Sequence, residues 1–188
     1  MGKSILVTGG ARSGKSSYAE SLAAKEGKAV LYVATSIPFD EEMKSRIHKH
    51  QQSRPKGWDT YEGYRYLGTY LKEMNTYYDA ILIDCITIMV TNLLFDFLDP
   101  SLDMDKLTME QIQQVEEKIQ QEIQLLLEGI EKTSSTVIMV TNELGSGIVP
   151  ESKLGRVFRD IAGRVNQQIA QRADRVYLTV CGIPMQIK

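Results

Sequence analysis

The sequence predicts a doubly wound α/β domain, and three observations lead to this fold class. Short apolar runs rich in β-formers alternate with helical patterns, which implies crossover connections and a mainly parallel sheet. The runs are nearly continuous in apolar residues, as expected when helices cover both faces of a sheet. The length of 188 residues suits one core, so we expect a single domain over residues 1–188. The expected strands are Ile5 to Val7, Ala29 to Val33, Ala80 to Ile83, Thr136 to Val140 and Arg175 to Val180.

The first expected strand leads directly into a glycine-rich loop. Residues Gly9 to Ser16 fit the pattern G-x-x-x-x-G-K-[ST] without a gap, and a helix-competent stretch follows from Ser17 to Lys25. Small residues let backbone N–H groups converge on a phosphate, and the positive end of the helix points at it. Lys15 is expected to neutralise the β- and γ-phosphates, and the Ser16 hydroxyl to bind Mg²⁺. The sequence therefore predicts a site for a nucleoside triphosphate.

Start and stop signals bound the helices that follow. Gly27 is expected to end the first helix. A second helix is expected from Asp40, with acidic residues in its first turn, to Gln51. Thr108 and Gln111 form a capping box for a long third helix. The apolar stripe of that helix consists of Ile112, Val115, Ile119, Ile123, Leu126 and Ile130.

The C-terminal part is expected to add a helix and an edge strand. Val157, Ile161, Val165 and Ile169 recur at four-residue spacing, which indicates a helix that faces the core. After the fifth expected strand, the tail from Ile183 to Ile187 can pair with it as an antiparallel strand, through a turn at Cys181-Gly182.

Asp84 follows the third expected strand, so its carboxylate should lie at the carboxyl edge of the sheet. Ligands of open α/β sheets bind at that edge. Beside a phosphate-binding loop, an acidic residue there reaches Mg²⁺ directly or through water. The alternative is that Asp84 caps a helix beginning at Cys85. The phosphate-binding loop favours the metal.

The only histidines, His48 and His50, fall in the helix expected from Asp40 to Gln51. Their side chains would point roughly 200° apart on a helix, which excludes a shared metal site there. His50 aligns with Met43 and Ile47 on the inward stripe. From local sequence alone, such a histidine is more often structural than catalytic.

Composition narrows the classes of function. The 24 acidic and 22 basic residues nearly cancel, so no overall positive field attracts nucleic acid or an anionic membrane. The most apolar stretch, residues 80–95, contains Asp84 and Asn92 and falls short of a membrane span. The N-terminus shows no export segment, and we expect Cys85 and Cys181 to be buried, reduced thiols. These features predict a cytoplasmic protein.

Three motifs narrow the interpretation further when they are taken together. They are the loop Gly9–Ser16, the pattern R-x-x-x-H-x-x-x-R-P from Arg46 to Pro55, and T-N-E-x-G-x-G-I-V-P from Thr141 to Pro150. The segment from Phe158 to Gln167 extends the match. In these motifs the chain resembles the bifunctional adenosylcobinamide kinase / adenosylcobinamide-phosphate guanylyltransferase family of cobalamin biosynthesis, over nearly its whole length.

The resemblance implies a RecA-like P-loop NTPase fold, a homotrimer, and two reactions on one corrinoid substrate. The enzyme would phosphorylate adenosylcobinamide, using GTP or ATP with Mg²⁺, and would then transfer GMP from GTP onto the new phosphate. In the family the guanylyl group passes through a covalent bond to histidine, and the R-x-x-x-H spacing assigns this role to His50. The resemblance therefore reverses the structural interpretation of His50.

The resemblance also implies the nucleotide contacts. It assigns catalysis to Lys15 and His50 and metal binding to Ser16 and Asp84. The expected nucleotide contacts are Gly9, Gly10, Ala11, Arg12, Ser13, Gly14, Lys15, Ser16, Ala34, Thr35, Ser36, Gln51, Gln52, Ser53, Arg54, Glu62 and Asp84.

Two other functions remain compatible with the phosphate-binding loop. One is a simple small-molecule kinase in which Lys15 and Asp84 act and His50 is structural. The other is a RecA-like nucleotide-dependent switch, which would hydrolyse nucleotide slowly and respond to a protein or DNA partner. The balanced charge argues against DNA.

Overall fold

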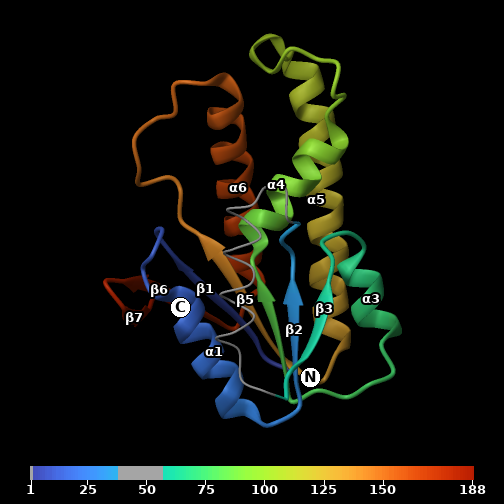
Figure 1. Ribbon diagram of the computed structural model, residues 1–188, viewed down its shortest axis with the longest axis vertical. Coiled ribbons are helices and arrows are strands. Elements are labelled where there is room, and N and C mark those ends of the chain that lie inside the picture. Colours follow the sequence, from blue (N-terminus) through green and yellow to red (C-terminus); the bar gives the residue numbers. More distant parts are fainter. Residues whose placement is uncertain (1, 38–56) are drawn as a thin grey trace.

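The computed structural model describes residues 2–37 and 57–188, and its seven strands form one sheet in the order β3-β2-β4-β5-β1-β6-β7 (Figure 1). The first six strands in this order run parallel, and β7 pairs antiparallel with β6. The predicted α/β fold with a mainly parallel sheet is therefore confirmed. The strands are β1 (Ser4–Gly9), β2 (Val30–Ala34), β3 (Asp59–Glu62), β4 (Ala80–Asp84), β5 (Thr136–Asn142), β6 (Arg175–Val180) and β7 (Ile183–Gln186).

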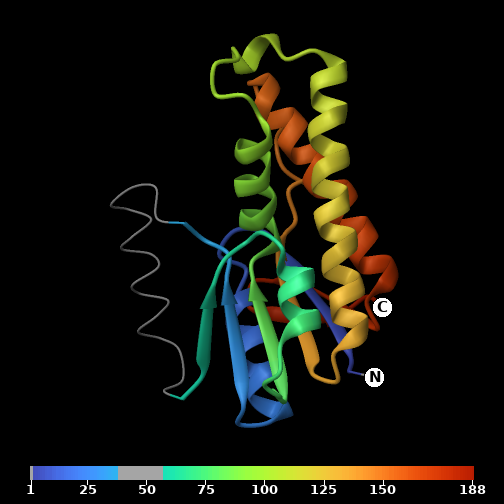
Figure 2. The same ribbon diagram turned by 90° about the vertical axis from the view of Figure 1, so that its right-hand side faces the viewer.

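The helices divide unequally between the two faces of the sheet. Among the described residues, α1 covers one face, while α3, α4, α5 and α6 form a layer on the other (Figures 1 and 2). In Figure 2, α4, α5 and α6 extend well beyond the sheet, past the end at which the parallel strands finish. The helices are α1 (Lys15–Glu26), α3 (Leu67–Glu73), α4 (Ile86–Phe97), η1 (Met104–Lys106), α5 (Met109–Lys132) and α6 (Lys153–Arg172).

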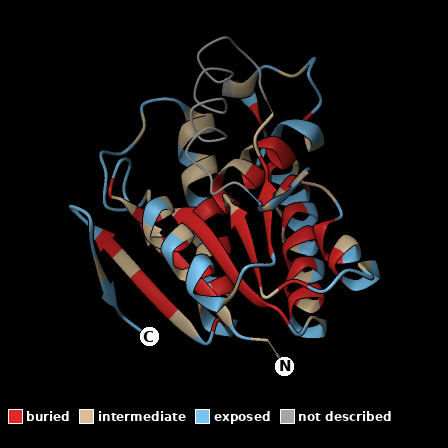
Figure 3. Ribbon diagram, turned by 60° about the horizontal axis from the view of Figure 1, so that its bottom comes forward, coloured by how far each residue is buried: buried red, intermediate tan, exposed pale blue. Residues whose placement is uncertain are grey.

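Alternation along the central strands separates two apolar cores. In β1, Leu6 packs into the core beneath α3 to α6, while Ile5 and Val7 pack into the core beneath α1. All three side chains are essentially inaccessible, and the central strands are buried along their length in Figure 3. Burial on both faces explains why these strands are nearly continuous apolar runs in the sequence.

Most of the local signals act as the sequence indicates. Thr108 and Gln111 form both hydrogen bonds of the capping box at the start of α5. Gly27 follows the last residue of α1, and the tail strand pairs with β6 as expected. The helix expected from Asp40 to Gln51 lies outside the described residues.

The expectation of two buried thiols is wrong for Cys181, which is exposed. It occupies the tight turn between β6 and β7 with a φ of 51°, at the surface, and its apolar sequence neighbours belong to the strands on either side. Cys85 is partly buried, at the start of α4.

Candidate active site

The phosphate-binding loop, Gly9–Ser16, connects β1 to α1 and curls into a backbone concavity. Arg12 has a φ of 56° and Gly14 a φ of 90°, whereas Ser13 between them has no positive φ. Such an alternation turns successive N–H groups toward one point. Gly14 precedes α1 as its N-cap residue and provides no side-chain hydrogen bond to the helix. The first N–H groups of α1 are therefore left for a ligand, and the helix dipole favours an anion.

Lys15, the first residue of α1, extends its amine into this loop. Its Nζ donates a hydrogen bond to the Gly10 carbonyl oxygen at 2.9 Å, and its side chain is buried. Burial lowers the pKa of Lys15, and the neighbouring Cys85 and Asp84 groups partly offset this shift. A cation that is held out of water beside the loop interacts strongly with a bound phosphate.

Parallel pairing aligns three expected site residues at the carboxyl edge of the sheet. Ala34, the last residue of β2, is in register with Glu62 at the end of β3 and with Asp84 at the end of β4. On the other side of β5, Gly9 is in register with Asn142. Segments that are far apart in sequence thus meet at the edge where the phosphate-binding loop begins.

The Asp84 carboxylate accepts a hydrogen bond from the Tyr32 hydroxyl at 2.9 Å. It does not cap α4, because the N-cap residue is Cys85 and no side chain there bonds to the helix. The capping alternative for Asp84 is therefore wrong. The Tyr32 hydroxyl fixes one carboxylate oxygen and leaves the group partly accessible.

The oxygens of Ser16 and Asp84 fit Mg²⁺ by their chemistry, since this ion prefers hard oxygen ligands and retains several waters. Within residues 2–37 and 57–188, no group of three or more His, Cys, Asp or Glu side chains could hold a metal by itself. A hydroxyl and one carboxylate form an incomplete set that phosphate oxygens and water would complete. This is the arrangement expected of a metal that arrives with its nucleotide.

Thr35 ties the end of β2 to the start of α4. Its hydroxyl accepts from the Cys85 N–H and donates to the Cys85 carbonyl oxygen, both at 2.8 Å. The Asn92 amide donates to the Thr35 carbonyl oxygen at 2.8 Å. Burial, with the nearby Asp84 charge, raises the pKa of the Cys85 thiol to about 12, so this thiol is neutral. The Thr35 side chain thus organises the backbone next to Asp84.

The segment after β5 begins beside the phosphate-binding loop. The Glu143 N–H donates to the Gly9 carbonyl oxygen at 3.0 Å. The Glu143 carboxylate accepts from the N–H groups of Gly145 and Ser146. Burial alone would raise the pKa of Glu143, but these hydrogen bonds outweigh it and leave the pKa lowered. Ile148 and Val149 then project into solvent.

Sequence reasoning missed several residues at this edge. Tyr32 lies inside an apolar run and gives no local signal of contact with Asp84. Thr87, Thr141 and Asn166 form hydrogen bonds with one another across 25 to 54 residues of sequence, which no local pattern reveals. Of the expected residues, His50, Gln51, Gln52, Ser53 and Arg54 lie outside the described part of the chain.

Comparison with solved structures supports the fold. An ATPase from the type III secretion system of pathogenic bacteria superposes with a TM-score of 0.52 at 10% sequence identity, over 95% of this chain and 51% of that one. This similarity concerns the fold alone. It agrees with the RecA-like P-loop fold implied by the sequence motifs, which is confirmed.

Comparison with curated proteins is more specific. Proteins named bifunctional adenosylcobalamin biosynthesis protein are 48% identical in Escherichia coli K12 and 49% identical in Salmonella typhimurium LT2. Each alignment covers 98% of this chain and 99% of the relative. The Pseudomonas aeruginosa protein of the same description is 39% identical over 97% of this chain and 96% of its own length.

A family model described as cobinamide kinase / cobinamide phosphate guanyltransferase matches residues 5–187. This range includes the phosphate-binding loop, Asp84 and the segment after β5. The chain belongs to the cobinamide kinase / cobinamide phosphate guanyltransferase family.

Proposed function

We propose that one domain of this chain carries out two successive reactions on adenosylcobinamide. It phosphorylates the aminopropanol hydroxyl, and it then transfers GMP from GTP to that phosphate, which yields adenosylcobinamide-GDP. The observation that carries this proposal is the full-length family match, together with Lys15 and Asp84 at one edge of the sheet. A simple kinase or a nucleotide switch would share the edge geometry but not the family match.

In the kinase reaction, the substrate hydroxyl oxygen attacks the γ-phosphorus of GTP or ATP, the nucleoside diphosphate leaves, and the hydroxyl proton passes to water. The N–H groups at the start of α1 would hold the phosphates, and Lys15 would offset the charge that develops on the leaving oxygens. Mg²⁺ held by Ser16 and Asp84 would supply further positive charge when bound. The Tyr32 hydroxyl would keep the Asp84 carboxylate oriented.

In the transfer reaction, we assign the nucleophile to His50 from the motif R-x-x-x-H-x-x-x-R-P. A neutral imidazole nitrogen attacks the α-phosphorus of GTP, and pyrophosphate leaves, which gives a phosphoramidate. The phosphate of adenosylcobinamide phosphate then attacks the same phosphorus and releases the imidazole. Arg54 would contact the nucleotide, together with Gln51, Gln52 and Ser53.

The remaining nucleotide contacts would come from the ends of β2 and β3. Ala34, Thr35 and Ser36 follow one another out of β2, and Glu62 ends β3 in register with Ala34. Glu62 is exposed at this edge. Its carboxylate could therefore accept hydrogen bonds from a ribose or a base, which would distinguish one nucleotide from another.

We also propose that the chain acts as a homotrimer in the cytoplasm. Exposed apolar side chains on the β6–β7 hairpin, Val180, Ile183 and Met185, offer a surface that a second copy would cover. Light scattering of the purified protein should give the mass of three chains. Within residues 2–37 and 57–188, no helix is both long and apolar enough to cross a membrane.

The assignment of His50 can be tested with GTP labelled at the α-phosphate. Wild-type protein and the matched control His48→Ala should retain an acid-labile, base-stable label after denaturation, whereas His50→Ala should retain none. Label on His50→Ala would overturn the assignment. Absence of label on the wild type would favour a simple kinase.

A further inference from the structure

A closed ring of hydrogen bonds lies behind the carboxyl edge of the sheet. Its members are Thr87 in the first turn of α4, Thr141 and Asn142 at the end of β5, and Asn166 in α6. The Thr87 and Thr141 hydroxyl oxygens lie 3.1 Å apart, and Thr141 lies 2.7 Å from the Asn166 carboxamide oxygen. The Asn166 amide donates to the Asn142 carbonyl oxygen at 3.0 Å, and the Asn142 N–H donates to the Thr87 hydroxyl oxygen at 2.6 Å.

The direction of each hydrogen bond in this threonine–asparagine ring is determined. Thr141 donates its only hydroxyl hydrogen to Asn166, so Thr87 must donate to Thr141. A flipped Asn166 carboxamide would place its oxygen against the Asn142 carbonyl oxygen, which excludes that orientation. Thr87 and Thr141 are buried, so neither can exchange its partner for water. One arrangement of donors therefore satisfies the whole ring.

The ring immobilises both backbone polar groups of Asn142, and Asn142 is in register with Gly9, the first residue of the phosphate-binding loop. The next residue, Glu143, donates its N–H to the Gly9 carbonyl oxygen at 3.0 Å. Two hydrogen bonds and the peptide group between Asn142 and Glu143 thus connect Asn166 to the loop. Because Thr87 lies three residues after Asp84, the same ring also sets the position of the segment that follows the expected metal ligand.

We propose that Asn166 is a positioning residue of the nucleotide site. Through Asn142 and Glu143 it holds the start of the phosphate-binding loop, so that the loop N–H groups point at the phosphates before a nucleotide arrives. This role rests on the proposed function only for its nucleotide-binding step. The positioning role of Asn166 does not depend on the corrinoid or on His50.

The test measures equilibrium binding of GTP, and separately of ATP, with Mg²⁺ and without a corrinoid. Asn166→Asp replaces the donor with an oxygen that faces the Asn142 carbonyl, and Thr141→Val removes the hydroxyl at constant volume. Each should weaken binding about tenfold, as expected for a lost buried hydrogen bond. Thr141→Ser keeps the hydroxyl and should bind within about twofold of wild type.

A control separates positioning from general stability. Asp174→Ala removes the hydrogen bonds to Ser4 at the opposite edge of the sheet. It should lower the melting temperature and leave nucleotide affinity unchanged. Wild-type affinity in both Asn166→Asp and Thr141→Val, or an equal loss in Asp174→Ala, would overturn the proposal.

Amide exchange of the wild-type protein tests the same proposal if the variants fail to fold. The amides of Asn142 and Glu143 should exchange with solvent as slowly as those in the middle of β5, and fast exchange of either amide would overturn the proposal. If the wild type binds neither nucleotide, the proposed function fails, and the exchange rates still decide whether the ring holds Asn142.

Discussion

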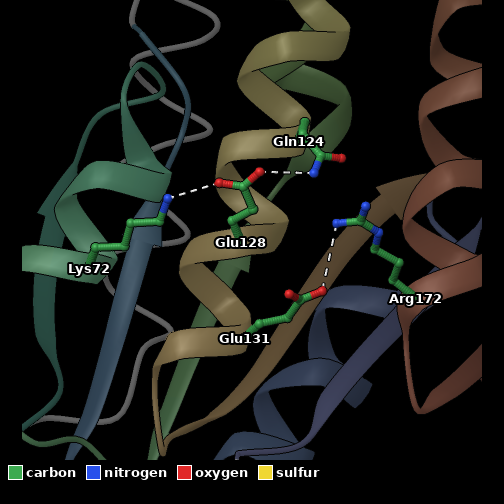
Figure 4. A network of polar contacts seen from close by, with 5 residues as sticks. All are labelled: Lys72, Gln124, Glu128, Glu131 and Arg172. Atoms are coloured by element: carbon green, nitrogen blue, oxygen red, sulfur yellow. Dashed lines mark hydrogen bonds and ion pairs between the residues drawn. The ribbon is translucent and has the colours of Figure 1, made fainter.

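The carboxyl edge of the sheet and the outer side of the layer formed by α3, α5 and α6 both carry polar networks, but the two are built differently. At the edge, the threonine–asparagine ring is neutral and largely buried, and each donor has one acceptor. On the helix layer, Glu128 accepts from Lys72 and from Gln124, both at 3.0 Å, and Arg172 lies 3.7 Å from Glu131 (Figure 4).

The difference lies in what competes with each contact. Water and salt reach the charges in Figure 4, so these pairs add little to the stability of the fold. The hydrogen bonds from Gln124 and then from Lys72 lower the pKa of Glu128, yet its carboxylate remains at the surface. The donors and acceptors of the buried ring cannot exchange their partners for water. The ring therefore holds the backbone of Asn142 in one position. The comparison teaches that the polar network at the carboxyl edge fixes the positions of backbone groups at the site. The helix layer, by contrast, stabilises the fold through its apolar packing.

The largest effect is expected at Lys15. Lys15→Met removes the charge beside the phosphates and should lower both reactions by about 100- to 1000-fold, the range for loss of one preorganised electrostatic contact. Because the amine is buried and its pKa is lowered, the folded protein should lose no stability. Product formation and thermal unfolding measure the two effects separately. A variant that remains active, or one that unfolds, would contradict this division of roles.

The next effect is expected at Asp84. Asp84→Asn keeps an oxygen that can accept from Tyr32 but removes the charge, so turnover should fall about 100-fold. Tyr32→Phe keeps the charge and removes only the orienting hydroxyl, so its loss should be about tenfold. Steady-state rates at several Mg²⁺ concentrations measure both. Equal losses in the two variants would show that orientation matters as much as charge.

In the helix layer, the expected effect concerns stability. A side chain at Gly68 of α3 would overlap the Leu125 carbonyl oxygen of α5, so Gly68→Ala should lower the free energy of unfolding by about 1–3 kcal/mol. The Michaelis constant for GTP should stay at its wild-type value. Gly163→Ala is the matched control in α6, where nothing lies within 4 Å of the added carbon. It should gain about 0.5–1 kcal/mol. Urea unfolding measures whether the free energy of unfolding falls in Gly68→Ala and rises in Gly163→Ala.

The smallest effect is expected at Glu128. Glu128→Gln should leave the melting temperature indistinguishable from wild type at physiological salt, because its partners are exposed and screened. At low salt, a slight decrease should become measurable. A large decrease at physiological salt would show that the surface network contributes more than this comparison allows.

The central part of the fold was predictable from the sequence because its signals are local. Continuous apolar runs predicted five strands, and the capping box at Thr108 predicted the start of α5. The short edge strand β3 was missed because residues 59–62 are mostly polar and exposed, without an apolar run. The helix α3 was missed because it has only seven residues and its N-cap residue, Tyr66, provides no side-chain cap.

The candidate site was predictable to a similar extent. The roles of the phosphate-binding loop and of Asp84 could be predicted because each lies at the end of an expected strand. The contact of Tyr32 with Asp84 and the hydrogen bonds of the threonine–asparagine ring depend on tertiary packing. No local sequence pattern predicts either of them. The role of His50 stays a prediction from its motif.

The most direct test of the central claim follows both products formed from adenosylcobinamide and GTP. With His50→Ala, adenosylcobinamide phosphate should accumulate while no adenosylcobinamide-GDP forms, because Lys15 and Asp84 still support the first reaction. His48→Ala should form both products. Formation of adenosylcobinamide-GDP by His50→Ala at the wild-type rate would contradict the account.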